Sequence, residues 1–205
     1  MEVGVKVGRS TSTMSMGEAV GAVVVDRTSG SSAVVIAAAG DARWRGISEE
    51  SRQGCGNAAA HAVMRAIGLV ARKRRSFLVG QNSGHQNADT PELFVDEPIT
   101  SLETDLYEQS TLAAGGYLCH DLELYVTHEP CVMCSMAINH SRFGRVIFGQ
   151  CMLTGGLGTQ NRDTNGSDCE YCTYGLWWRP ELNWKFLTWS WVGDDDLQTA
   201  ADVHA

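Results

Sequence analysis

Three residues of this chain have the types and spacing of metal ligands: His61, Cys131 and Cys134. Cysteines at positions i and i+3 of a helix lie on one face, about 5–6 Å apart at Cβ, and can therefore bind the same ion. Pro130 suits the first turn of such a helix, where unpaired amides stabilise thiolates. Two thiolates and one imidazole leave the fourth position of a tetrahedral site open, as in catalytic zinc sites. The sequence therefore predicts Zn²⁺ as a cofactor held by these three side chains.

The elements predicted around these residues favour metal binding over chance. A single C-x-x-C motif often arises by chance, and a histidine at a helix start is more often a hydrogen-bonded structural residue than a ligand. Here His61 lies in a helix predicted from Ala58 to about Arg74, and the cysteine pair opens a helix predicted from Cys131 to Ser141. The second helix directly follows a strand-like run from Leu122 to Thr127. Two helix starts that meet at the end of a sheet form a usual place for a site in α/β folds.

The other predicted elements complete an α/β domain. Apolar, β-branched runs from Ala19 to Asp26 and from Ala33 to Ala39 flank a short polar loop and indicate a β-hairpin. A strand from Arg145 to Gly149 completes a β-α-β unit, which implies parallel strands and a right-handed crossover. Most of the tryptophans gather between residues 177 and 191, where we expect a C-terminal helix packed on the sheet. Stacking of these rings on RNA bases is the less favoured alternative, because no basic residues alternate with them.

The length of 205 residues suits one domain. Composition predicts a flexible N-terminus over residues 1–16, a single domain over 17–192 and an acidic tail over 193–205. Within the domain, residues from about 76 to 112 mix Gly, Asn, His, Pro and acids, which predicts a loop insertion.

Composition also restricts the compartment. The sequence has no run of 18 apolar residues and no N-terminal signal pattern. We therefore expect that the protein neither associates with a membrane nor is secreted. Seven cysteines, an odd number, argue against an extracellular disulfide framework, and the second C-x-x-C pair, Cys169 and Cys172, fits two ordinary thiols. We therefore expect the protein in the nucleus, the cytoplasm or both.

The net charge of −8 is unfavourable for binding nucleic acid, yet one run concentrates basic residues: Arg72, Lys73, Arg74 and Arg75. Two interpretations of this run have equal weight. It is either a solvated helix end stabilised by the helix dipole, or a surface that contacts RNA.

Val63 stands where a catalytic residue is expected. The zinc deaminase signature is H-x-E followed by P-C-x-x-C, and its glutamate moves protons without binding the metal. Here the first half is His61-Ala62-Val63 and the second is intact from Pro130 to Cys134. Because an isopropyl group transfers no proton, the sequence indicates a deaminase-like domain that keeps its metal site and lacks the general acid and base.

Longer stretches resemble a known family, the non-catalytic subunit of the eukaryotic heterodimeric tRNA adenosine deaminase, within the zinc-dependent cytidine and deoxycytidylate deaminases. The matching residues are His61 to Ile67, Glu129 to Ala137, His140-Ser141-Arg142, Gly155 to Thr159 and Pro180 to Asn183. The resemblance spans about residues 19 to 190 and is weak in the predicted insertion.

This resemblance implies a cytidine-deaminase-like three-layer α/β/α sandwich with a mixed central sheet. It implies zinc ligands at His61, Cys131 and Cys134, and makes Val63 a typical residue of this subunit. It further implies a partner chain with an intact H-x-E motif, and conversion of adenosine to inosine at the wobble position of tRNA by the two chains together. Asp41 aligns with an asparagine that active relatives use to bind the base. Family members usually have a sizeable extra region before the deaminase domain that is implicated in holding the tRNA, whereas this sequence starts close to its first predicted strand. RNA other than tRNA therefore stays open as a substrate.

Two other functions stay open beside this one. In the first, the chain is an active zinc deaminase with a substitute carboxylate, and Glu129 is nearest in sequence to the cysteine helix. In the second, it is an inert zinc domain that only binds other proteins. The fourth metal position also has an alternative ligand from the acidic tail: Asp202, His204 or the terminal carboxylate.

Overall fold

A five-stranded mixed sheet forms the centre of the molecule. The computed structural model describes residues 1–27, 33–46, 56–81 (backbone only for 76–81), 97–110, 112, 116–152, 154–158 and 174–191. The strands are β1 (Gly21–Asp26), β2 (Val34–Gly40), β3 (Glu123–His128), β4 (Arg145–Gln150) and β5 (Leu187–Ser190), in the spatial order β2-β1-β3-β4-β5. β1 is antiparallel to β2 and β3, whereas β3, β4 and β5 are parallel. The predicted mixed sheet is therefore confirmed.

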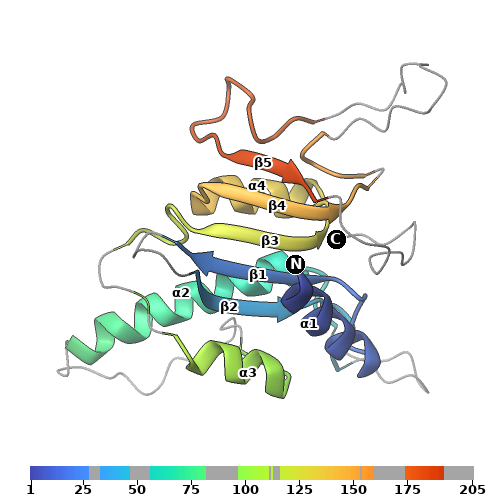
Figure 1. Cartoon of the computed structure of the whole chain (residues 1–205), viewed down its shortest axis with the longest axis vertical. Helices are drawn as coiled ribbons and strands as arrows, with labels where there is room; N and C mark the ends of the chain where they lie inside the picture. Colours follow the sequence, from blue (N-terminus) through green and yellow to red (C-terminus); the bar gives the residue numbers. More distant parts are fainter. Residues whose placement is uncertain are drawn as a thin grey trace.

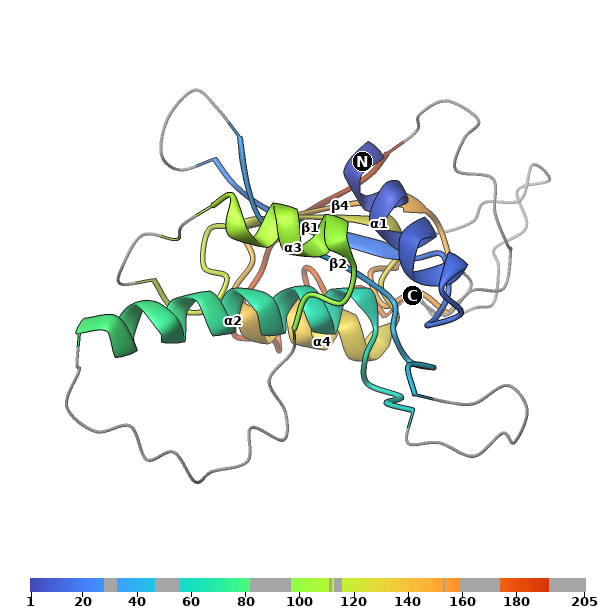
Figure 2. The same cartoon turned by 90° about the horizontal axis from the view of Figure 1, so that it is seen from below.

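Helices cover both faces of this sheet. α2 (Ala62–Gln81) and α4 (Val132–Ser141) lie on one side, and α1 (Glu2–Thr13) and α3 (Ser101–Glu108) lie on the other (Figure 1 and Figure 2). Strand residues alternate between the two layers. Ala22 and Val24 of β1 join the main apolar core with α2 and α4, whereas Val23 and Val25 join a smaller cluster with α1 and α3. The predicted three-layer α/β/α sandwich is confirmed.

The predicted hairpin and the predicted β-α-β unit are also confirmed. β1 and β2 form the hairpin, and α4 connects the parallel strands β3 and β4. Among the described residues, no helix is long and apolar enough to cross a membrane.

The flexible N-terminus predicted over residues 1–16 is wrong, because most of it forms α1. The buried residues of α1 recur at helical spacing: Gly4, Val7, Gly8 and Thr11. The two glycines allow close approach to β1, where a Cβ on Gly21 would lie 1.9 Å from the Gly4 carbonyl oxygen. The polar composition suggests mobility, whereas the i, i+4 spacing of the small residues is the signal for a docked helix.

The loop predicted over residues 76–112 is wrong in part. α2 continues to Gln81 and α3 lies within the predicted loop, while residues 82–96 lie outside the described part of the chain. Thr100 caps α3 by accepting a hydrogen bond of 3.2 Å from the Glu103 backbone N–H. This T-x-x-E spacing is the helix-start signal that composition hides.

A strand stands in place of the predicted C-terminal helix. The described residues 174–191 contain β5, which pairs in parallel with β4. Two hydrogen bonds anchor its approach: Trp184 Nε1 donates to the Phe143 carbonyl at 2.8 Å, and Asn139 Nδ2 donates to the Trp184 carbonyl at 2.7 Å. The sequence Leu-Thr-Trp-Ser-Trp from Leu187 to Trp191 alternates with the period of a strand, and that period outweighs the aromatic clustering.

A buried ion pair joins the two helical layers around the edge strand β2. Arg65 of α2 and Glu103 of α3 have side chains only 2% and 0% exposed, and Arg65 Nη1 lies 2.9 Å from Glu103 Oε1. The Gly40 N–H donates to Glu103 Oε1 at 2.8 Å, and the Gly40 carbonyl accepts from Arg65 Nη1 at 2.7 Å. The pair therefore fixes the end of β2 to the first turn of α2.

Lys73 of α2 also points into the protein. It is 8% exposed, and its Nζ donates to the Ile36 carbonyl at 2.6 Å and to Ser110 Oγ at 2.7 Å. The Nζ lies 4.4 Å from the centroid of the Tyr107 ring, a favourable cation–π distance. Burial lowers the pKa of Lys73 to about 8. The ammonium form still predominates at neutral pH, and the folded protein releases this proton at lower pH than the unfolded chain does.

We expect Glu103→Gln to lower the free energy of unfolding by about 3–5 kcal/mol, because the variant leaves the Arg65 charge buried without its carboxylate. Urea denaturation measures this loss. Glu108→Gln removes an exposed acid from the same helix and should change stability by less than about 0.5 kcal/mol. Equal effects of the two variants would contradict a structural function for the ion pair.

The lowered pKa of Lys73 also predicts a pH dependence. Between the folded pKa of about 8 and the ordinary lysine pKa of 10.5, the unfolded chain binds more protons, so stability rises with pH. This rise amounts to at most about 3.4 kcal/mol. Lys73→Met should abolish it in urea titrations across this range, whereas Lys6→Met, at an exposed lysine of α1, should retain it. An unchanged slope in Lys73→Met would show that another group causes the rise.

Candidate metal centre

The three predicted ligands meet between the starts of α2 and α4. His61 immediately precedes α2, Cys131 is the N-cap residue of α4, and Cys134 lies in the first turn of α4. Their ligand atoms all lie within 4.8 Å of one another, and Cys131 Sγ is 3.9 Å from His61 Nδ1. Residues that are 70 positions apart in sequence are thus brought together at one end of the sheet.

The donor set fits zinc. Tetrahedral coordination with ordinary Zn–S and Zn–N bonds places ligand atoms roughly 3.6–3.8 Å apart. The Sγ–Nδ1 distance of 3.9 Å needs only a small adjustment to reach that range. Cys134 is buried and Cys131 is half-buried.

The two thiols share one proton. A hydrogen bond from Cys134, with a smaller contribution from His61, lowers the pKa of Cys131 to about 4. The same hydrogen bond and burial raise the pKa of Cys134. Cys134 therefore holds its proton more tightly than Cys131, and a metal that binds both sulfurs must displace that proton.

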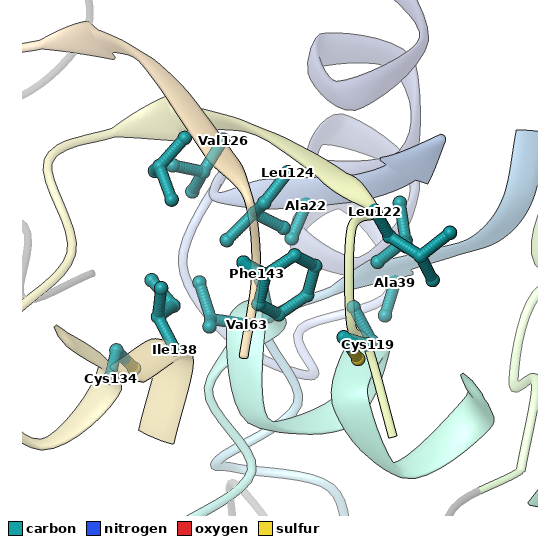
Figure 3. Packing of buried hydrophobic residues seen from close by; sticks show 14 of the residues in the cluster. Ala22, Ala39, Val63, Cys119, Leu122, Leu124, Val126, Cys134, Ile138 and Phe143 are labelled. Atoms are coloured by element: carbon teal, nitrogen blue, oxygen red, sulfur yellow. The ribbon is translucent and has the colours of Figure 1, made fainter. Parts of the chain in front are cut away.

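Val63 lies in the apolar core beside this centre. It is 1% exposed, and Figure 3 shows its side chain between Ile138 of α4 and Phe143, with Cys134 at the margin of the same cluster. The position that carries glutamate in the deaminase signature is thus filled by a side chain that packs and transfers no proton.

Glu129, the candidate substitute carboxylate, is fully engaged with a neighbouring loop. It is 1% exposed, and it accepts hydrogen bonds of 3.1 Å from the backbone N–H groups of Met152 and Gly158. A Cβ on Gly155 would lie 2.1 Å from the Glu129 carboxyl carbon, so this loop closes tightly around the side chain. Glu129 therefore holds the loop against the start of α4.

A second carboxylate near the centre is also paired. Asp41 is buried, and its Oδ2 lies 2.8 Å from Arg43 Nε. The charges of both residues act on the Cys134 thiol, Asp41 raising and Arg43 lowering its pKa, which places the pair close to the metal centre. Arg43 is absent from the predicted site residues. The sequence feature that indicates Arg43 is its position as a basic residue two places after an acid at the end of a strand.

The run predicted as a possible RNA contact is only partly accessible. Lys73 is buried, so its predicted contact with RNA is wrong. Arg74 Nε donates to the Leu118 carbonyl, and Arg72 Nη1 lies 3.7 Å from Glu97 Oε1. Arg75 is exposed. Successive residues of a helix point about 100° apart, so four adjacent basic residues do not share one face.

Two predictions fall on residues outside the described part of the chain. They are the thiol pair Cys169 and Cys172, and the fourth metal ligand from Asp202, His204 or the terminal carboxylate. Both stay predictions.

We expect the purified protein to bind one Zn²⁺, and His61→Ala, Cys131→Ser or Cys134→Ser each to lower the zinc affinity more than about 100-fold. Each variant leaves only two of the three ligands. Competition with a chromophoric chelator measures the affinity. Cys151→Ser, at a half-buried cysteine outside the cluster, should leave it unchanged. Equal affinities in all four variants would exclude this site as the metal centre.

Comparison with known proteins gives consistent matches. Residues 1–150 match the family described as the cytidine and deoxycytidylate deaminase zinc-binding region. The chain is 32% identical over 145 residues to the tRNA-specific adenosine deaminase subunit tad3 of Schizosaccharomyces pombe, covering 70% of this chain and 33% of that protein. It is 35% identical over 161 residues to the probable inactive tRNA-specific adenosine deaminase-like protein 3 of Danio rerio, covering 78% of this chain and 40% of that protein.

A shorter match lies with a bacterial protein. The chain is 43% identical over 64 residues to the tRNA-specific adenosine deaminase of Rickettsia typhi, covering 31% of this chain and 38% of that protein. The chain thus spans between a third and two fifths of the length of these three relatives. Because the family match covers most of the chain and contains all three candidate ligands, this protein belongs to the family of the cytidine and deoxycytidylate deaminase zinc-binding region.

Proposed function

We propose that this chain is the non-catalytic, zinc-binding subunit of a heterodimeric RNA adenosine deaminase. Val63 carries the proposal, because a buried apolar side chain fills the position of the proton-transferring glutamate beside an assembled ligand set. The similarity to relatives named as a deaminase subunit and as probable inactive deaminase-like proteins supports it.

In this proposal the two chains have different functions. The partner carries an intact H-x-E motif and converts adenosine to inosine at the wobble position of tRNA. This chain holds Zn²⁺ through His61, Cys131 and Cys134, supports the fold of the partner and contributes to RNA binding. The family's metal activates water for attack on the base. In this chain Glu129 is engaged by backbone amides and Asp41 by Arg43, so neither is placed to move a proton.

Two alternatives lead to different observations. An active deaminase that uses Glu129 is disfavoured, because protonation of that carboxylate would weaken its hydrogen bonds to Met152 and Gly158. An inert interaction module would bind some other protein, so native mass spectrometry of the purified complex separates it from our proposal. We also propose a nuclear or cytoplasmic location, since a reducing compartment keeps the thiolate ligands available.

The proposal predicts the activity of separated and combined chains. The isolated chain should form no inosine in a tRNA anticodon stem-loop, whereas the complex with its co-purified partner should be active. Changing the glutamate of the partner's H-x-E motif to glutamine should abolish that activity. Turnover by the isolated chain at a rate comparable to that of the complex would overturn the proposal.

Val63→Glu in this chain should not create activity. The new carboxylate would enter the apolar cluster around Ile138 and Phe143, and should lower the free energy of unfolding by roughly 2–4 kcal/mol at pH 7. Burial raises the pKa of such a group, so this loss should shrink as the pH falls. The glutamine side chain of Val63→Gln has nearly the same shape as glutamate but no charge, so the stability of this variant should show no such pH dependence.

A further inference from the structure

One half of the sheet carries no helix on the side of α1 and α3, within the described part of the chain. α1 packs on β1, β2 and β3, and α3 packs on β2. Figure 1 shows both helices beside the β1 and β2 half, with β5 at the opposite edge of the sheet. Val146 and Phe148 of β4 face the core with α2 and α4. The alternate residues Arg145 and Ile147 therefore face the uncovered side.

Three large apolar side chains lie on the same side of the sheet as Arg145 and Ile147. The strand register places Leu187 beside Arg145 and Trp189 beside Ile147. The Trp191 N–H donates to the Phe148 carbonyl at 2.6 Å, so the extended pairing continues and Trp191 faces the same way as Trp189. Leu187, Trp189 and Trp191 are 55%, 47% and 51% exposed, respectively. We call Arg145, Ile147, Leu187, Trp189 and Trp191 the open face.

Positive charge accompanies these rings. Arg145 Nη1 lies 2.6 Å from Glu123 Oε1, and Arg27 Nε lies 2.8 Å from Glu123 Oε2. The arginine side chains are 53% and 51% exposed, whereas that of Glu123 is 5% exposed. Two guanidinium groups thus share one buried carboxylate, which orients them and leaves a local excess of one positive charge on a chain of net charge −8.

We infer that the open face binds single-stranded RNA, with bases stacked on Trp189 and Trp191 and phosphates paired with Arg145 and Arg27. This inference rests on the proposed function, which makes RNA the substrate of the complex. Exposed aromatic rings beside guanidinium groups on a sheet are the combination that binds unpaired nucleotides. An apolar protein segment would match the tryptophans, but it would also remove water from two arginines without supplying a counter-charge.

The pairing of β3, β4 and β5 creates this combination. In the sequence the tryptophans have no basic residue alternating with them, and Arg27 and Arg145 lie far away along the chain. The register of β4 and β5 places Arg145 beside Leu187, and Glu123 holds Arg27 close to Arg145 on the same side of the sheet.

Binding of tRNA by the complete heterodimer gives the first measurement. Trp189→Leu and Trp191→Leu keep the apolar character of the strand and remove the flat ring, so each should weaken tRNA binding about tenfold in a filter-binding assay. Trp178→Leu is the matched control, because Trp178 is 54% exposed and lies outside the open face. The control should retain full affinity.

Salt dependence provides a second measurement. Arg145→Gln should lower the slope of log affinity against log salt concentration by about 0.7–0.9, the value of one phosphate contact. Arg9→Gln, at an exposed arginine of α1, should leave the slope unchanged. Equal slopes in both variants would contradict a phosphate contact at Arg145.

The isolated chain and a single-stranded RNA of about ten nucleotides separate this inference from the proposed function. The RNA should quench tryptophan fluorescence, and Trp189→Leu with Trp191→Leu should remove that quenching. An active heterodimer with undiminished tRNA affinity in these variants would overturn the inference and leave the proposed function standing. A heterodimer without deaminase activity would overturn the proposed function, while the isolated chain would still decide the inference. Loss of the partner with normal RNA binding would show a protein interface and refute the inference.

Discussion

The buried ion pair between Arg65 and Glu103 is the interaction on which the arrangement of the domain depends. β2 is an edge strand, and the peptide groups at its end would otherwise lack partners in the sheet. The guanidinium and carboxylate bind both polar groups of Gly40, so one charged pair completes the edge of the sheet. Arg65 also follows His61 by one helical turn, and its backbone N–H donates to the His61 carbonyl at 3.0 Å. The position of the candidate ligand His61 therefore depends on the ion pair of Arg65 with Glu103, which lies beside the edge strand β2.

The metal centre adds a second connection, between α2 and α4. Each carboxylate near it already has a structural partner: backbone amides hold Glu129, and Arg43 holds Asp41. These acids hold the loops beside the candidate ligands, while the buried Val63 makes the proton-transfer position apolar. The same residues thus explain why the chain retains a metal-binding geometry and why we assign turnover to another chain.

Local sequence patterns predict the elements that carry the ligands. The hairpin, the β-α-β unit and the convergence of His61 with the cysteine pair all follow from periodicity and spacing. The wrong predictions have a common cause, because composition and periodicity indicate different structures in these short segments. α1 is hidden by polar residues around Gly4 and Gly8, and β5 is hidden by clustered tryptophans. The inward direction of Lys73 and the grouping of Arg145 with Trp189 depend on tertiary contacts that no local pattern encodes.

The apolar side chain of Val63 spares this domain a strain that a catalytic carboxylate imposes. A general acid at this position must be kept partly desolvated, which strains the native state in exchange for reactivity. A valine in the same cluster needs no such desolvation, so a chain that leaves proton transfer to its partner, as we propose, packs this cluster without that cost. In the proposed heterodimer, the apolar packing around Val63 and the reactive carboxylate thus belong to different polypeptides.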